Sequence, residues 1–141
     1  MRDILFRAKA INRDSIDGRC RRTDYKNGDW VYGLITKPYN EEYDFPAEMR
    51  NTDGVTGIEV DYKTIGQYTG LTDKNGVKIF EGDIVEYEGT RYSINYLPHY
   101  ARFSAVKPNT VFCVFAYQRG EVIGNIYDNP ELIGGNEDEN D

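Results

Sequence analysis

TIGQYTGLTDKNGVKIFEGDIVEY, residues 64–87, carries the strongest fold signal in the chain. It holds three short patterns of alternating apolar and polar side chains, the period of a half-buried strand. Two turn sequences, DKNG at residues 73–76 and EGD at residues 81–83, separate these patterns. Asn-Gly accepts the positive φ angles that a tight hairpin turn requires. The stretch therefore predicts consecutive antiparallel hairpins.

Further strand patterns lie on both sides of this block, each bounded by turn residues. They occupy residues 4–11, 30–35, 57–61, 91–96, 101–106, 111–117 and 122–127. The pattern at 111–117 is apolar at nearly every position, which is typical of a central strand covered on both faces. We find no convincing pattern of an amphipathic helix. We therefore predict an all-β, or mainly β, fold with little helix: a small barrel-like or multi-sheet β domain with SH3-like hairpin elements.

One folded domain is expected over residues 1–133, because a chain of 141 residues suits a single core. Residues 37–57 interrupt the strand patterns with Pro, Asn, Asp and Glu and a few scattered aromatic side chains. We interpret them as a long exposed loop, which is either a place of specific recognition or a mobile surface insertion. GGNEDEND at residues 134–141 is too polar to repay the entropy of ordering, and it predicts a disordered acidic tail.

The chain is acidic, with a formal net charge of −7. Basic residues exceed acidic ones in residues 1–26, which contain eight Lys or Arg and four Asp. A nucleic-acid-binding domain normally carries a basic face, so the charge disfavours nucleic acid as the main partner. The cluster of Arg19, Arg21 and Arg22 lies beside Asp17 and Asp24. That arrangement is typical of a solvated loop with local ion pairs.

Cysteine usage and the lack of a long apolar segment bear on the compartment. Cys20 and Cys113 are far apart in sequence and form no CxxC motif. Residues 1–12 contain no apolar signal region, and no stretch approaches the roughly 18 consecutive apolar residues of a membrane span. We therefore expect reduced thiols, a cytoplasmic location and no contact with a membrane.

Four segments carry a resemblance to a known family. They are MRDILFRAKA at residues 1–10, WVYGLI at 30–35, the block at 64–87 and EVIGNIYDNPEL at 121–132. In order and spacing they resemble the YopX family of phage and prophage proteins. The resemblance implies a mostly β domain encoded by phages or integrated elements, present in the bacterial host cell and without an assigned biochemical activity. Residues 38–56 and the acidic tail depart from it, so a role that resides there does not transfer.

The candidate chemical groups do not assemble into a catalytic or metal-binding set. His99 follows Pro98 and has no second His or nearby Cys, whereas a zinc site needs three or four protein ligands. Ser93 and Ser104 lie in strand patterns, outside the strand-to-helix turn that exposes a nucleophilic serine. We therefore expect no metal, no cofactor and no enzymatic activity.

Four carboxylates around one turn carry the alternative of an enzyme or a small-molecule site. They are Glu81, Asp83, Glu86 and Glu88. Alternation places Glu86 and Glu88 on one strand face, where a pair could serve acid–base chemistry or bind a divalent cation. A solvated strand face explains the same pattern, because carboxylates are seldom buried without partners. Asp83 after Gly82 is expected to brace the turn by accepting hydrogen bonds from backbone amides.

Tyrosines supply the candidate interaction surface. It comprises Tyr68, Tyr87, Tyr92, Tyr96 and Tyr100, together with the basic cluster Arg19, Arg21 and Arg22. Tyrosine is enriched at protein interfaces, and tyrosines beside a basic groove could also stack nucleic-acid bases. We favour a non-enzymatic protein-interaction module whose partner is a host or phage protein, or a second copy of the chain in a homo-oligomer. The alternative is a nucleic-acid-associated module in phage replication or regulation.

Overall fold

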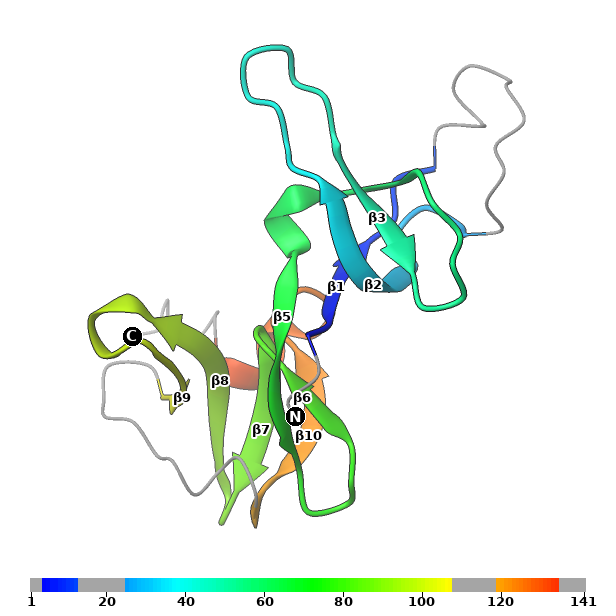
Figure 1. Ribbon diagram of the computed structural model, residues 1–141. Helices are drawn as coiled ribbons and strands as arrows, with labels where there is room; N and C mark the ends of the chain where they lie inside the picture. Colours follow the sequence, from blue (N-terminus) through cyan, green and yellow to red (C-terminus); the bar gives the residue numbers. More distant parts are fainter. Residues whose placement is uncertain (1–3, 13–24, 108–118, 135–141) are drawn as a thin grey trace. The chain divides into compact units, whose positions relative to one another are not determined.

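The structure is a computed structural model, and it describes residues 4–12, 25–107 and 119–134 (Figure 1). The chain forms two compact units, one of residues 3–67 and the other of residues 68–141 with residues 1 and 2. It passes from the first unit to the second within strand β5 (Gly66–Thr72). The single domain expected over residues 1–133 stays a prediction. No helix within the described ranges is long and apolar enough to span a membrane.

The first unit contains an antiparallel sheet with the strand order β4-β3-β2-β1. Its strands are β1 (Phe6–Lys9), β2 (Trp30–Lys37), β3 (Ala47–Asn51) and β4 (Ile58–Val60), and the 3-10 turn η1 (Tyr62–Thr64) follows β4. The first residues of β5, Gly66 and Gln67, pair with β1. The core consists of Ala8, Ala10, Val31, Ala47, Met49, Ile58 and Val60. The strands predicted within residues 4–11, 30–35 and 57–61 are confirmed.

Strand β3 lies inside residues 37–57, which the sequence predicted as a loop, and that part of the prediction is wrong. Ala47 and Met49 are fully buried, whereas Glu48 is half-buried and Arg50 is exposed. The period of a strand is therefore present. Two apolar positions, one of them an alanine, make a pattern too short and too weakly apolar to recognise in the sequence.

The first unit nearly closes on itself. Ala10, just beyond β1, forms an isolated antiparallel bridge with Val60 of β4. The Ile11 N–H donates to the Glu59 carbonyl oxygen (2.8 Å) at this bridge. One bridge does not close a barrel, and neither sheet closes within the residues that the structure describes. The multi-sheet form of the prediction is therefore the one observed, and the barrel-like form is not.

The second unit contains an antiparallel sheet with the strand order β10-β7-β8-β9. Its elements are β7 (Asp83–Tyr87), β8 (Thr90–Leu97), η2 (Pro98–Tyr100), β9 (Arg102–Val106), β10 (Glu121–Asn125) and η3 (Pro130–Ile133). The remainder of β5 pairs with β6 (Lys78–Phe80). The core consists of Ile79, Val85, Ile94 and Ala105. The β5–β6, β7–β8 and β8–β9 hairpins are confirmed, but β6 and β7 do not pair with each other, so the turn at residues 81–83 does not close a hairpin. The strand predicted at residues 111–117 lies outside the described residues.

The buried carboxylate of Asp73 holds the turn at residues 73–76. Its Oδ1 accepts from the N–H groups of Asn75 (2.8 Å) and Val77 (2.9 Å). Its Oδ2 accepts from the Val122 N–H in β10 (2.9 Å). Burial acts to raise the pKa of Asp73, but the donors on Val122, Val77 and Asn75 outweigh it and lower the pKa below its ordinary value. The predicted turn therefore also fastens the β5–β6 hairpin to β10.

The turn at residues 81–83 is fixed by backbone and side-chain contacts. The Asp83 Oδ2 accepts from the Phe80 N–H (2.7 Å), which confirms the predicted bracing role. Gly82 has a φ of +93°, and a Cβ there would lie 3.1 Å from the Tyr127 ring. The Gly82 N–H donates to the Ile94 carbonyl oxygen (2.8 Å). Both turns of residues 64–87 are therefore structural elements of the second unit.

Candidate interaction surface

The connection between β2 and β3, residues 38–46, forms a tight hairpin end that we call the tip. Figure 1 shows it in cyan, continuing beyond the ends of the two strands. The Asn40 N–H donates to the Phe45 carbonyl oxygen (3.0 Å), and the Phe45 N–H donates to the Asn40 carbonyl oxygen (3.1 Å). The Asn40 Oδ1 accepts from the Tyr43 N–H (3.0 Å), and Asp44 takes a left-handed φ of 57°. Local hydrogen bonds therefore fix the backbone of the tip.

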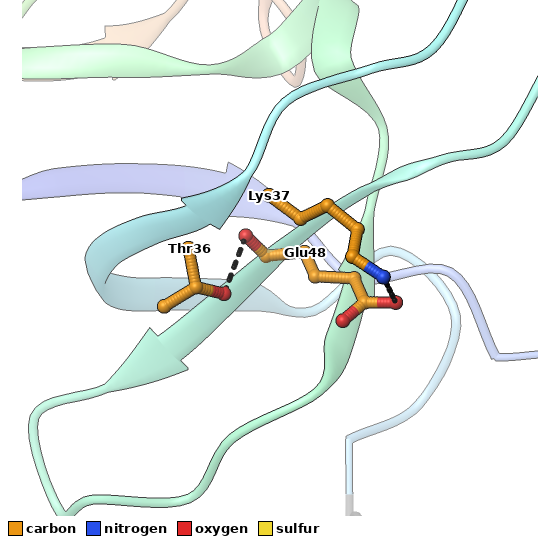
Figure 2. Close-up of polar contacts among 3 residues, drawn as sticks. All are labelled: Thr36, Lys37 and Glu48. Carbon is orange, nitrogen blue, oxygen red and sulfur yellow. Dashed lines mark hydrogen bonds and ion pairs between the residues drawn. The ribbon is translucent and has the colours of Figure 1, made fainter.

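The base of the tip is a β-bulge between β2 and β3. The register shifts between Ile35 and Lys37, which leaves Thr36 as the extra residue. The Thr36 Oγ1 donates to the Glu48 carbonyl oxygen (3.2 Å), and Lys37 Nζ lies 3.9 Å from Glu48 Oε2. Figure 2 shows both contacts as dashed lines. A bulge bends its strand and re-aims side chains, and bulges are frequent beside functional sites. The ion pair is largely exposed and contributes little to stability.

Two aromatic pairs lie at the tip and the adjacent η1. Tyr43 and Phe45 are 62% and 59% exposed, and their ring centres are 5.8 Å apart. The Tyr39 ring stacks on Tyr62 with the centres 3.9 Å apart. The Tyr39 hydroxyl donates to Asp44 Oδ1 (2.9 Å), and this hydrogen bond is the largest cause of the raised pKa of Tyr39. The tip thus has an inner pair held by contacts and an outer pair that faces solvent.

The tip is also acidic. Glu41, Glu42 and Asp44 are exposed, and residues 38–46 contain no Lys or Arg. Carboxylates attract cations by Coulomb forces, and exposed aromatic rings attract them by cation–π contact. The tip is therefore suited to a surface that offers both apolar area and positive charge.

A shallow pocket of about 160 Å³ lies beside the tip. Its lining includes Tyr39, Pro46, Val60, Tyr62 and Lys63. Small-molecule sites usually measure roughly 300–1,000 Å³, so this pocket is small for a metabolite. Its size suits a single side chain of a protein partner.

The five tyrosines predicted as an interaction surface differ in exposure. Tyr68 is buried, and Tyr87 and Tyr92 pack partly buried against the core of the second unit. Tyr96 and Tyr100 are exposed. The role of these side chains as an interaction surface stays a prediction, and Tyr96 and Tyr100 are the two that a partner could reach most readily.

The predicted basic cluster, Arg19, Arg21 and Arg22, lies outside the described residues. Another group of cations, which the sequence analysis did not single out, lies on the β1–β2 pair. Arg7 Cζ is 4.6 Å and Lys9 Nζ is 5.4 Å from the centre of the Trp30 ring. The strand register produces this group, because it pairs Lys9 directly with Trp30.

The carboxylates of residues 81–88 have separate environments. Asp83 is buried in the turn, and Glu86 Oε1 lies 3.7 Å from Arg91 Nε. Glu88 occupies a left-handed turn position, with a φ of 52°. His99 is exposed in η2. Across the described ranges, no group of three or more His, Cys, Asp or Glu side chains is placed to hold a metal ion.

The sequence predicts recognition in residues 37–57 as one of two interpretations, but it does not single out Tyr43 and Phe45. A usable signal was present, because Asn40 and Asp44 favour turns and three aromatic residues, Tyr39, Tyr43 and Phe45, each lie next to one of them. The exposure of the two rings depends on the bulge at Thr36 and on the contacts of the tip. Neither can be inferred from the order of residue types.

Comparison with known proteins identifies the family. A family model described as YopX protein matches residues 20–134, so the chain belongs to the YopX family and the resemblance is confirmed. The crystal structure of protein EF1440 from Enterococcus faecalis is similar, with a TM-score of 0.54 and 25% sequence identity. That match covers 94% of this chain and 99% of the other. Comparison with the curated proteins gave no match.

Proposed function

We propose that this YopX-family chain is a phage or prophage accessory protein that acts without catalysis, in the bacterial cytoplasm, by binding another protein through the tip. The observation that carries the proposal is the pair of exposed rings, Tyr43 and Phe45, on a backbone fixed by local hydrogen bonds. Tyr and Phe are enriched at protein interfaces. The phage origin rests on the resemblance to the family.

The energetics of such a contact are favourable. A Tyr or Phe side chain buries roughly 150–250 Å², and about three-fifths of each ring-bearing side chain is still exposed at the tip. At about 25 cal/mol per Å², burying both would contribute on the order of 6 kcal/mol before the costs of association. Those costs are reduced because the backbone of the tip is already ordered by its own hydrogen bonds.

The test is affinity capture of the tagged full chain from infected or induced host cells, with nuclease treatment and mass spectrometry. The test variant replaces Tyr43 and Phe45 with Ala. The control is Val77→Ala, because Val77 is an exposed apolar residue (48%) that lies in the second unit and belongs to neither candidate surface. We expect the tip variant to recover at least about tenfold less of a nuclease-resistant partner. The control should recover as much as the wild type.

Two outcomes would contradict the proposal. Equal recovery of the partner by the wild type and the tip variant would show that Tyr43 and Phe45 do not bind it. Recovery by the wild type that disappears after nuclease treatment would show that nucleic acid, and not protein contact, holds the captured material.

A second candidate function is binding of single-stranded nucleic acid, favoured by the placement of Lys9 against Trp30. Arg7 also lies over the Trp30 ring, but it is buried (6% exposed), so Lys9 is the cation that a phosphate would reach. Cations next to an aromatic ring provide both phosphate attraction and a stacking surface. The chain has one Trp, so titration with an oligothymidylate can be followed by the fluorescence of Trp30. Binding that weakens with salt and is reduced in Lys9→Gln would support this candidate. Unchanged Trp30 fluorescence during the titration at low salt would exclude this second candidate function.

A further inference from the structure

An apolar groove lies on the first unit at the end of the β2–β3 hairpin away from the tip. Its volume is about 260 Å³, and its lining includes Ile4, Leu5, Gly33, Leu34 and Arg50. Ile4 and Leu34 are 69% and 43% exposed. A side chain at Gly33 would collide with the Arg50 carbonyl oxygen, so glycine at this position lets β3 approach β2 closely. The groove is therefore built by the sheet itself.

The charge of the groove is opposite to that of the tip. Arg50 lies directly across the strand pair from Leu34 and is exposed. Among the described residues that line the groove, none is acidic. The tip offers the opposite combination, because it carries three exposed carboxylates around two exposed rings. Apolar area and charge therefore match between the two surfaces.

One molecule cannot bring these two surfaces together. Gly33 in the groove and Asn40 in the tip are joined by an almost continuous strand. At about 3.3 Å per residue, the strand separates them by roughly 20 Å. The strand is paired with β3 along this length, so it cannot fold back on itself.

We propose that the groove binds the tip of a second copy of the chain. Phe45 and Tyr43 of one copy enter the groove of the other and pack against Leu34 and Ile4. The carboxylates of the tip then lie near Arg50. This inference rests on the proposed function, since it takes the tip as the binding element and names a second copy as its occupant.

The contact is head to tail, which has a consequence for assembly. Each copy that uses its tip still presents a groove, and each copy that uses its groove still presents a tip. Such contacts continue into open chains or close into rings, depending on the rotation between copies. Two aromatic side chains bury far less than the roughly 1,200 Å² of a stable interface, so the association is weak and depends on concentration.

Sedimentation of the full chain from about 10 µM to about 1 mM tests the proposal in the range where such weak contacts form. We expect the average mass to rise above the 16.2 kDa of one chain as concentration increases. Phe45→Ala and Arg50→Glu should each weaken association by about tenfold or more. Val77→Ala, the control at an exposed apolar residue of the second unit that belongs to neither candidate surface, should associate as the wild type does. Circular dichroism confirms that each variant is folded.

A mixture of the two variants gives the decisive result. Phe45→Ala keeps an intact groove and Arg50→Glu keeps an intact tip, so together they can form one productive contact. The mixture should therefore reach the mass of two chains and no more, at concentrations where each variant alone is monomeric. A monomeric wild type over the whole range, or a mixture that stays monomeric, would overturn the proposal.

The same variants separate this inference from the proposed function. Arg50→Glu damages the groove and leaves the tip intact, so in the capture experiment it should still recover a separate protein partner. Suppose that Arg50→Glu still recovers a separate protein partner while the wild type shows no self-association. The proposal that a second copy occupies the groove is then wrong, but the tip remains a binding element. If Phe45→Ala changes neither capture nor sedimentation, both proposals fail.

Discussion

Asp73→Asn should destabilise the second unit by about 1–3 kcal/mol, the cost of leaving a buried polar group without its hydrogen bond. Asp73 is buried, and its two carboxylate oxygens accept from three backbone N–H groups. Asparagine keeps one acceptor oxygen and replaces the other with an NH₂ group, which cannot accept. If the remaining oxygen keeps accepting from the N–H groups of Asn75 and Val77, the Val122 N–H loses its acceptor and lies against the new NH₂ group, which is itself a donor.

The effect should depend on pH in a defined direction. Because the folded-state pKa of Asp73 is lowered, its carboxylate stabilises the fold above the pKa of the unfolded chain, about 4. This stabilisation is lost as the pH falls through the folded-state pKa. The difference in unfolding free energy between the wild type and Asp73→Asn should therefore be complete at neutral pH and should shrink below about pH 4.

Amide hydrogen exchange measured by NMR provides the assay, because it reports on the Val122 N–H directly. We expect faster exchange at Val122 in Asp73→Asn, together with a lower urea midpoint. Asp53→Asn serves as the control, because Asp53 is exposed and should change the unfolding free energy by less than about 0.5 kcal/mol. Unchanged protection of Val122 in the folded variant would refute the claim that Asp73 fastens the hairpin to β10.

Further predictions concern the second turn, the core and the tip. Gly82→Ala should reduce the free energy of unfolding by about 1–3 kcal/mol and so lower the thermal midpoint, since a φ of +93° is unfavourable for Ala and its Cβ would crowd Tyr127. An unchanged midpoint would count against this packing. Met49→Ala should lower the free energy of unfolding, measured in urea, by about 2–5 kcal/mol because Met49 is fully buried in the first unit. A decrease below about 1 kcal/mol would contradict that burial. Asp44→Asn should bring the raised pKa of Tyr39 down toward that of ordinary tyrosine, as NMR titration of the ring would show; an unmoved pKa would exclude Asp44 as its main cause.

The parts of the fold that could be predicted from the sequence are those set by local interactions. Asn75-Gly76 and Gly82 impose turn geometry on their own neighbours, and the flanking alternation gives the strands between them. The same local reasoning predicted that Asp83 accepts a backbone hydrogen bond, and its donor, the Phe80 N–H, lies three positions earlier in the chain. It failed at β3, where the apolar side of the strand rests on Ala47 and Met49 alone. Pairing with both β2 and β4, and not local preference, makes that segment a strand.

The candidate site could be predicted only as a region, because exposure is a tertiary property. Tyr68 and Tyr43 are the same residue type, yet one is buried and the other is 62% exposed. Tyr68 packs on Phe80 because the strand register brings their rings within 5.5 Å. Tyr43 faces solvent because the hydrogen bonds of Asn40 hold the turn that carries it. Register and turn contacts, which a single sequence does not display, separate a core tyrosine from a binding tyrosine.

The residues that hold the turns and the residues that we expect to bind a partner meet different physical demands. Asp73 and Gly82 are buried residues at turns, where most substitutions leave an unpaired group or a steric clash. Tyr43 and Phe45 contribute little to the core, so their replacement changes stability little and is free to change what is bound. The partner must be sought with variants of the tip, because substitutions there test binding while the buried turns keep the fold.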